Sequence, residues 1–130
     1  MPAVPKAITN GLCVSVESEF IPERSNPDQP LFFFAYHITI KNEGDRPLTL
    51  KNRYWHITDA AGQVEEVRGP GVVGYQPRLE KDQSFQYTSF CPLRTEFGTM
   101  KGTYEMVWDD GETFDAEIPA FQLMTPHSVN

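Results

Sequence analysis

The motif with the most recognisable chemistry is the segment GPGVVG at residues 69–74, which has the spacing G-x-G-x-x-G. In dinucleotide-binding proteins this spacing lets the amides at a helix N-terminus contact pyrophosphate. That arrangement needs a buried strand before the glycines and a helix after them. Here the preceding residues, QVEEVR, are polar, and Pro77 follows too soon for a helix to form. The sequence therefore argues against a dinucleotide-binding fold.

Two interpretations of the glycine segment remain open. In the first, the glycines adopt positive φ and turn the chain between two sheets, while Val72 and Val73 pack against the protein. In the second, successive backbone amides form an anion nest beside a basic side chain. The hypothetical nest would consist of Gly69, Gly71, Val72, Val73, Gly74 and Arg68, with Arg53 or Arg78 as a further cation.

No metal site is predicted, because the side chains that zinc prefers are scattered and have no C-x-x-C or H-x-x-x-H spacing. They are Cys13, His37, His56, Cys91 and His127. The turn that carries Asp109, Asp110 and Glu112 offers at most a weak and unspecific site for a divalent cation.

No catalytic residue is predicted either. Neither a serine nor a cysteine lies in a nucleophile elbow, and paired carboxylates occur only in turns. No cofactor is expected. The sequence favours a binding protein over an enzyme.

Composition limits the class of protein further. The 130 residues suit a single domain, and 18 acidic against 11 basic residues give a net charge of -7, which disfavours nucleic-acid binding. The sequence has no apolar run long enough to span a membrane, and the opening residues MPAVPKAITNG do not form a secretory signal. With only two cysteines, we expect a cytoplasmic protein with free thiols.

Alternation of apolar and polar residues predicts about seven strands and no convincing helix. We expect flexible tails at residues 1–7 and after 125, and a loop at 21–30. The predicted strands are 12–20, 31–42, 48–58 (with a bulge at 51–52), 63–68, 84–91, 98–109 and 112–124. This pattern is typical of an all-β immunoglobulin- or fibronectin type III-like sandwich.

The alternation also assigns side chains to the two faces of each strand. Trp55 and Ile57 should point into the core, where a tryptophan fills the space between two sheets. His37 and His56 should point outward. Phe33 and Phe90 also have outward parity, so they would suit a surface that binds another protein.

The residues from RYWHITDAAGQVEEVRGPGVVGYQPRLEKDQSFQYTSF (53–90) into L-x-T-x-x-G-x-M-x-G-x-Y-x-M (93–106) resemble the bacterial ApaG family. The opening ITNGLCVSVESEF and the closing IPAFQLM are similar to the ends of that family. The resemblance implies one ApaG-like domain over residues 1–130, with a core at about 8–124 and a fibronectin type III-like fold.

The same resemblance implies a function only in outline, because the family has no established biochemical activity. Its domain is found in eukaryotic proteins as an interaction module, so a protein partner is expected here. Alternatively, the glycine segment binds phosphate or pyrophosphate, a role proposed for the family, with a link to cobalt and magnesium homeostasis.

Overall fold

The structure is a computed structural model that describes residues 4–26 and 28–126. It contains almost only β-structure, together with one turn of 3₁₀ helix, η1 (Pro22–Arg24). The strands, in chain order, are β1 (Lys6–Thr9), β2 (Leu12–Phe20), β3 (Phe32–Asn42), β4 (Leu48–Asp59), β5 (Val64–Pro70), β6 (Arg78–Leu79), β7 (Ser84–Leu93), β8 (Phe97–Trp108) and β9 (Thr113–Met124).

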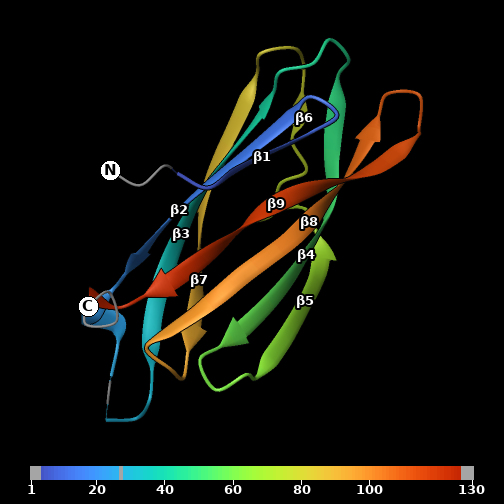
Figure 1. Ribbon diagram of the computed structural model, residues 1–130. Coiled ribbons are helices and arrows are strands. Elements are labelled where there is room, and N and C mark those ends of the chain that lie inside the picture. The colour runs from blue at the N-terminus through green and yellow to red at the C-terminus, as the bar shows by residue number, and fades with distance from the viewer. Residues whose placement is uncertain (1–3, 27, 127–130) are drawn as a thin grey trace.

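The strands form two antiparallel sheets that pack as a sandwich (Figure 1). One sheet has the order β1-β2-β3-β7, and the other has the order β5-β4-β8-β9 with the short β6 paired to β4. The sheets approach each other closely along β2 and β9, where Ser18 donates a hydrogen bond from its hydroxyl to the Gln122 carbonyl. The edge strands are β1 and β7 in the first sheet and β5 and β9 in the second.

The core lies between the sheets and is centred on three aromatic rings. Trp55 of β4 is only 2% exposed, and its ring lies 5.3 Å from that of Tyr36 and 5.9 Å from that of Phe121. Next to them, Tyr87 and Tyr104 join their buried hydroxyl groups in a hydrogen bond. Burial raises the pKa of both tyrosines, so both hydroxyls stay protonated at neutral pH.

The structure confirms the all-β sandwich and the inward position of Trp55. It also confirms two irregularities: the bulge falls between Leu50 and Asn52, and the phase of β9 shifts between Ile118 and Phe121. The closer comparison with immunoglobulin and fibronectin type III domains stays a prediction.

Two short strands were not predicted. Residues 1–7 were expected to be a flexible tail, but Lys6 and Ala7 begin β1, which pairs with β2. Backbone pairing with β2 orders Lys6 and Ala7, although so short a strand shows no alternation. Strand β6 has only two residues, too few for a period to be seen. The part of the expected N-terminal tail at residues 1–3, and the end of the C-terminal one at 127–130, lie outside the described residues.

Replacing Trp55 by alanine should lower the free energy of unfolding by about 3–5 kcal/mol, because the change leaves a cavity between the sheets. Replacing its outward-facing neighbour His56 by alanine should change it by less than about 0.5 kcal/mol. Denaturant unfolding of both variants measures the difference. A loss below about 1 kcal/mol for Trp55→Ala would contradict its place in the core.

Candidate functional site

The glycine-rich segment begins inside β5 and ends in a tight turn. Gly69 and Pro70 are the last residues of β5, and a two-residue turn at Val73 and Gly74 then reverses the chain. Hydrogen bonds between Val72 and Tyr75, in both directions, close this turn. The segment thus forms a small hairpin at one end of the sandwich.

The hairpin packs against the core. Val72 is 1% exposed, and the ring of Tyr75 lies 5.8 Å from that of Phe85 in the opposite sheet. Gly71 has a φ of 61°, and a Cβ atom there would lie 2.3 Å from the Tyr75 carbonyl oxygen. The backbone therefore requires a glycine at this position. These contacts agree with the structural interpretation of the segment, except that Val73 was expected to pack against the protein and is 50% exposed.

The amides of the hypothetical anion nest are not equivalent. The Gly71 amide donates to the Lys51 carbonyl at 2.9 Å, and the Val72 amide donates to the Tyr75 carbonyl at 2.8 Å. The amides of Val73 and Gly74 make no hydrogen bond with the described part of the chain. An anion would therefore meet two amides of this segment rather than four.

The arginines near the segment lie on opposite faces of the sheet. Arg53 shares the inner face with Trp55, and one of its guanidinium nitrogens donates to the carbonyls of Pro70 and Gly71. Arg68 has outward parity, lies 4.5 Å from the centre of the Tyr54 ring and pairs with Glu66. Its side chain is 71% exposed, so it keeps access to solvent. Arg53, in contrast, fixes the hairpin carbonyls.

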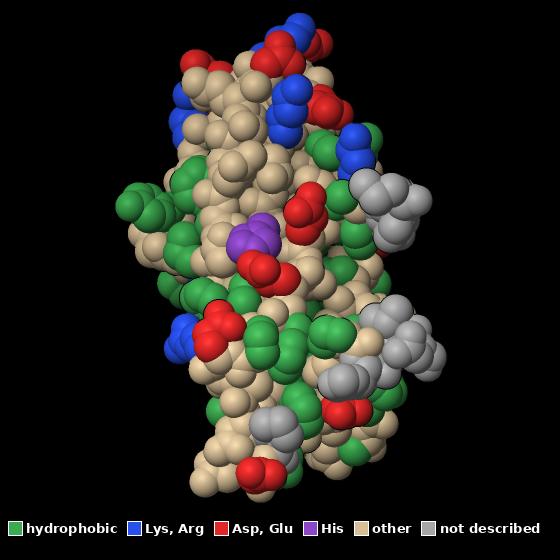
Figure 2. All heavy atoms as spheres, turned by 90° about the vertical axis from the view of Figure 1, so that its left-hand side faces the viewer, with side chains coloured by type: hydrophobic (Ala, Val, Ile, Leu, Met, Phe, Trp, Pro, Cys, Tyr) green, Lys and Arg blue, Asp and Glu red, His purple; other side chains and the backbone are tan. Residues whose placement is uncertain are grey.

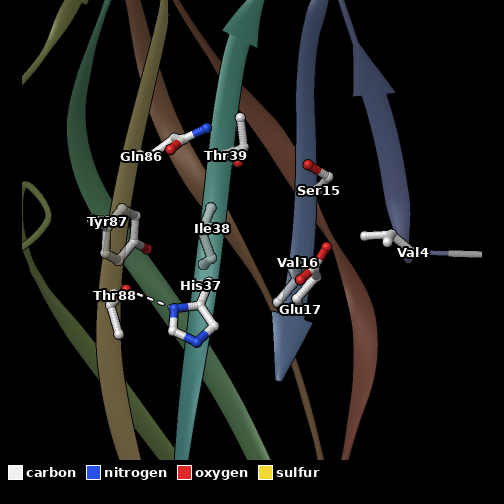
Figure 3. Close-up of a pocket in the computed structure, with 10 residues that line it drawn as sticks. All are labelled: Val4, Ser15, Val16, Glu17, His37, Ile38, Thr39, Gln86, Tyr87 and Thr88. Carbon is white, nitrogen blue, oxygen red and sulfur yellow. Dashed lines mark hydrogen bonds between the residues drawn. The ribbon is translucent and has the colours of Figure 1, made fainter. Parts of the chain in front are cut away.

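A second feature is a shallow hollow on the outer face of the first sheet, lined by residues of β2, β3 and β7 and by Val4 (Figure 3). His37 lies in this hollow between a carboxylate and a hydroxyl: Nε2 is 2.9 Å from Glu19 and Nδ1 is 2.7 Å from Thr88. Sequence reasoning predicted the outward direction of His37 but not these two partners.

A carboxylate, an imidazole and a hydroxyl in a row raise the question of nucleophilic catalysis. Acyl transfer also needs donors for the oxyanion, usually backbone amides. Here β3 pairs with β2 on one side and β7 on the other, so its amides are engaged in the sheet. The His37 side chain is also 43% exposed. The arrangement ties three strands together across the sheet surface.

A third feature is an aromatic surface at the end of the same face. The rings of Phe33 and Phe90 lie 5.5 Å apart, and the Arg24 guanidinium lies 4.2 Å from the centre of the first and 5.3 Å from that of the second. Phe90 remains 47% exposed. We call these three residues the Arg24 cluster. Figure 2 shows this face, where hydrophobic side chains gather beyond a histidine flanked by acidic residues.

Two carboxylates of the acidic turn at residues 109–112, a weak cation site in the sequence analysis, pair with arginines. Asp109 receives two hydrogen bonds from Arg78, and Asp110 pairs with Arg46 at 3.0 Å. The pKa of Asp109 is lowered chiefly by its hydrogen bond with Arg78. Residues 4–26 and 28–126 contain no group of three or more His, Cys, Asp or Glu side chains that could hold a metal ion.

The two cysteines are free and buried. Burial raises the pKa of the Cys91 thiol to about 12 and also raises that of Cys13. A thiol reacts as the thiolate, so neither cysteine is suited to act as a nucleophile at neutral pH.

Comparison with known proteins identifies the family. A family model described as the ApaG domain matches residues 22–108. The chain belongs to the ApaG domain family. A protein named ApaG from Anaeromyxobacter dehalogenans is 52% identical over 124 residues, which cover 95% of this chain and 98% of that protein. An ApaG protein from a Methylobacterium species is 52% identical over 122 residues, 94% of each chain.

Solved structures agree with this assignment and with the sandwich. A crystal structure of a Bordetella pertussis protein called ApaA has a TM-score of 0.86 and 45% identity, and the match covers 96% of this chain and 98% of that one. A second solved structure, an X-ray structure of a structural genomics target, has a TM-score of 0.85 at 45% identity, and the match covers 90% of this chain and 89% of the other. In the described residues, no helix is long and apolar enough to cross a membrane.

Two alanine substitutions separate the steric demand at Gly71 from its backbone conformation. Gly74→Ala should lower the free energy of unfolding by about 1–2 kcal/mol, because φ is 86° at this position. The new methyl group itself would lie in open space. Gly71→Ala should cost a further 1–3 kcal/mol or so, because its methyl group collides with the Tyr75 carbonyl. Thermal or denaturant unfolding compares the two. Equal losses would show that the hairpin adapts easily and that Gly71 is not sterically required.

Proposed function

We propose that this ApaG domain is a cytoplasmic, non-enzymatic module that binds a partner protein through the outer face of β3 and β7. The observation that carries the proposal is the Arg24 cluster. Arginine and aromatic side chains are enriched among the residues that dominate the energy of protein interfaces. Here one arginine and two phenylalanines stack on each other at the surface.

The cluster is organised before any partner arrives. Phe33 and Phe90 sit on adjacent paired strands, and they cover Ala35, which is only 2% exposed although it faces outward. Side chains held in this way lose little conformational entropy on binding, so more of the contact energy appears as affinity. A flat, preformed aromatic surface with one cation suits protein recognition better than it suits a small substrate.

The non-enzymatic part of the proposal is supported by the chemistry of the other sites. His37 lies on an open sheet surface where the amides of β3 are bonded to β2 and β7 and the amides of β7 lie along the plane of the sheet, and both thiols are buried. Catalysis at either place would need groups that these residues do not supply.

A partner should be captured reproducibly by the tagged wild-type protein from a lysate of its source organism, and Phe90→Ser should reduce that capture about tenfold or more. The matched control is Val64→Ser, since Val64 is a similarly exposed hydrophobic residue, 54% against 47%, on β5. Quantitative mass spectrometry measures the capture. If Phe90→Ser and Val64→Ser capture the same proteins equally, the outer face is not the binding surface.

A second candidate function is anion binding at the 69–74 hairpin, and a specific observation favours it. Val73 has a φ of 44°, a conformation that a β-branched residue rarely adopts. Strained backbone gathers at ligand sites. The amides of Val73 and Gly74 also have no protein acceptor within the described chain. Arg68 adds an exposed cation. A link to cobalt or magnesium homeostasis remains part of this second proposal.

With two amides on an open surface, pyrophosphate should bind with a dissociation constant on the order of 0.1–1 mM and should weaken as salt rises. NMR titration of ¹⁵N-labelled protein should then shift the Val73 and Gly74 amides before those of Gly71 and Val72. Arg68→Ala should weaken binding and leave the melting temperature almost unchanged. Unchanged resonances at millimolar pyrophosphate would remove this candidate.

A further inference from the structure

The hydrogen bonds on the two sides of β3 show which backbone groups of β7 point away from the sheet. Antiparallel strands exchange both bonds at every second residue, so the two sides of a central strand use alternate residues. The Ile21 amide donates to the Phe33 carbonyl, so odd residues of β3 bond to β2. The Asn42 amide donates to the Gln83 carbonyl, so even residues of β3 bond to the segment that continues into β7.

In this register the odd residues of β7 bond to β3, and the even residues direct their backbone groups away from the sheet. The free edge therefore offers four amides and five carbonyls, since proline has no N–H. The amides belong to Ser84, Gln86, Thr88 and Phe90, and Pro92 adds a carbonyl. Within the described ranges, no backbone group outside the sheet forms a hydrogen bond with these positions, and the Pro92 carbonyl accepts only a long contact of 3.9 Å from the Cys91 thiol.

The other edges of the sandwich carry features that discourage pairing with another chain. On β5, whose odd residues bond to β4, the free positions include Glu66, Arg68 and Pro70. Charged residues and proline are typical protections of an edge. On the bulged β9, the charged Asp115 occupies a free position, and the amide of Glu117 already donates to the Thr9 hydroxyl of β1. Strand β1 has only four residues.

Strand β7 has none of these protections along most of its length. It has ten residues, SFQYTSFCPL, without a single charge, and its one proline lies near the end. Charges, bulges or short length would be expected at an edge of this length that must stay unpaired. Uncharged, aromatic and β-branched residues instead favour the addition of a further strand.

We propose that β7 binds an extended segment of a partner protein as an added antiparallel strand. This inference rests on the interaction function proposed above and specifies how the partner binds. The added strand would satisfy the free amides and carbonyls of the even residues. Its outward side chains would lie beside Thr88 and Phe90, so an apolar residue of the segment would extend the aromatic surface.

Charge complementarity adds one requirement on the segment. The Arg24 guanidinium stacks on Phe33 and Phe90 but has no hydrogen bond or ion pair with any side chain among the described residues. A carboxylate in the segment, placed diagonally from Phe90, would provide its acceptor. Because the whole chain has a net charge of -7, a strongly acidic segment would be repelled, and a single carboxylate among uncharged residues fits best.

A second copy of this chain fits less well than a foreign segment. Pairing β7 with another β7 would satisfy the backbone, but β7 contains no aspartate or glutamate for Arg24. It would also bring two chains of charge -7 together.

The probe for this proposal is a phage library that displays random segments of roughly ten residues, the length of a long strand. Selection on the full-length protein should enrich segments with alternating apolar residues and one Asp or Glu. When an enriched peptide is added to the labelled protein, hydrogen exchange of the Ser84, Gln86, Thr88 and Phe90 amides should slow, while the amides of free positions on β5 should be unchanged.

Two substitutions at one position test the backbone contact. Gln86→Pro removes a free-edge amide without removing a bond to β3, and should weaken binding of the peptide about tenfold. Gln86→Thr keeps the amide and is the control, with affinity close to that of the wild type. Arg24→Gln should also weaken binding about tenfold if the carboxylate pairs with it. Titration calorimetry measures all three.

The outcomes distinguish this inference from the proposed function. If no segment is enriched, or Gln86→Pro binds as well as Gln86→Thr, strand addition is overturned. The face still binds a partner if Phe90→Ser loses the captured protein. If neither substitution has an effect, both proposals fail. Sedimentation analysis tests for pairing between two copies. If the wild type is a dimer and Gln86→Pro is a monomer, a second copy of the chain binds the edge of β7, and the proposal of a foreign segment is overturned.

Discussion

The packing of Trp55 against Tyr36 and Phe121 is the contact on which the rest of the molecule depends. It joins one strand of the first sheet to two of the second and determines which parity of each strand faces inward. Because side chains alternate along a strand, the same contact directs Phe33 outward to meet Arg24 and Phe90. A slip of one residue in β3 would bury the charged and polar row around His37, so core and surface are specified together.

Most of the fold could be predicted from the sequence because long strands with one buried face leave a clear period of two. The bulge after Leu50 was visible because the hydrophobic pattern changes phase there, and the same holds at the shift after Ile118. Strands β1 and β6 were missed for a physical reason: both are held by backbone pairing to a neighbour, and neither is long enough for its own side chains to show a pattern.

The candidate site was only partly predictable. Outward parity identified Phe33 and Phe90, but nothing local links them to Arg24, which lies in a segment expected to be a loop. Their contact depends on η1 folding back over β3. The glycine spacing was visible but ambiguous, because the same residues serve a turn or a nest. Only the structure shows that the Gly71 and Val72 amides are already engaged, and that Arg53 holds the hairpin carbonyls.

The register between β3 and β7 has a consequence for how the chain reaches its native state. Phe34 pairs with Cys91, and β4 with β8, so both sheets are closed by partners far apart in the chain. Such non-local pairing folds slowly, since the entropy of closing long loops is lost before the contacts form. During synthesis β3 leaves the ribosome well before β7, so one side of β3 has no strand partner until β7 is made. Because β7 carries no charge, it is the strand most prone to pair with a wrong strand once it is made. The strand best suited to bind a partner is therefore also the one where misassembly of a nascent chain would begin.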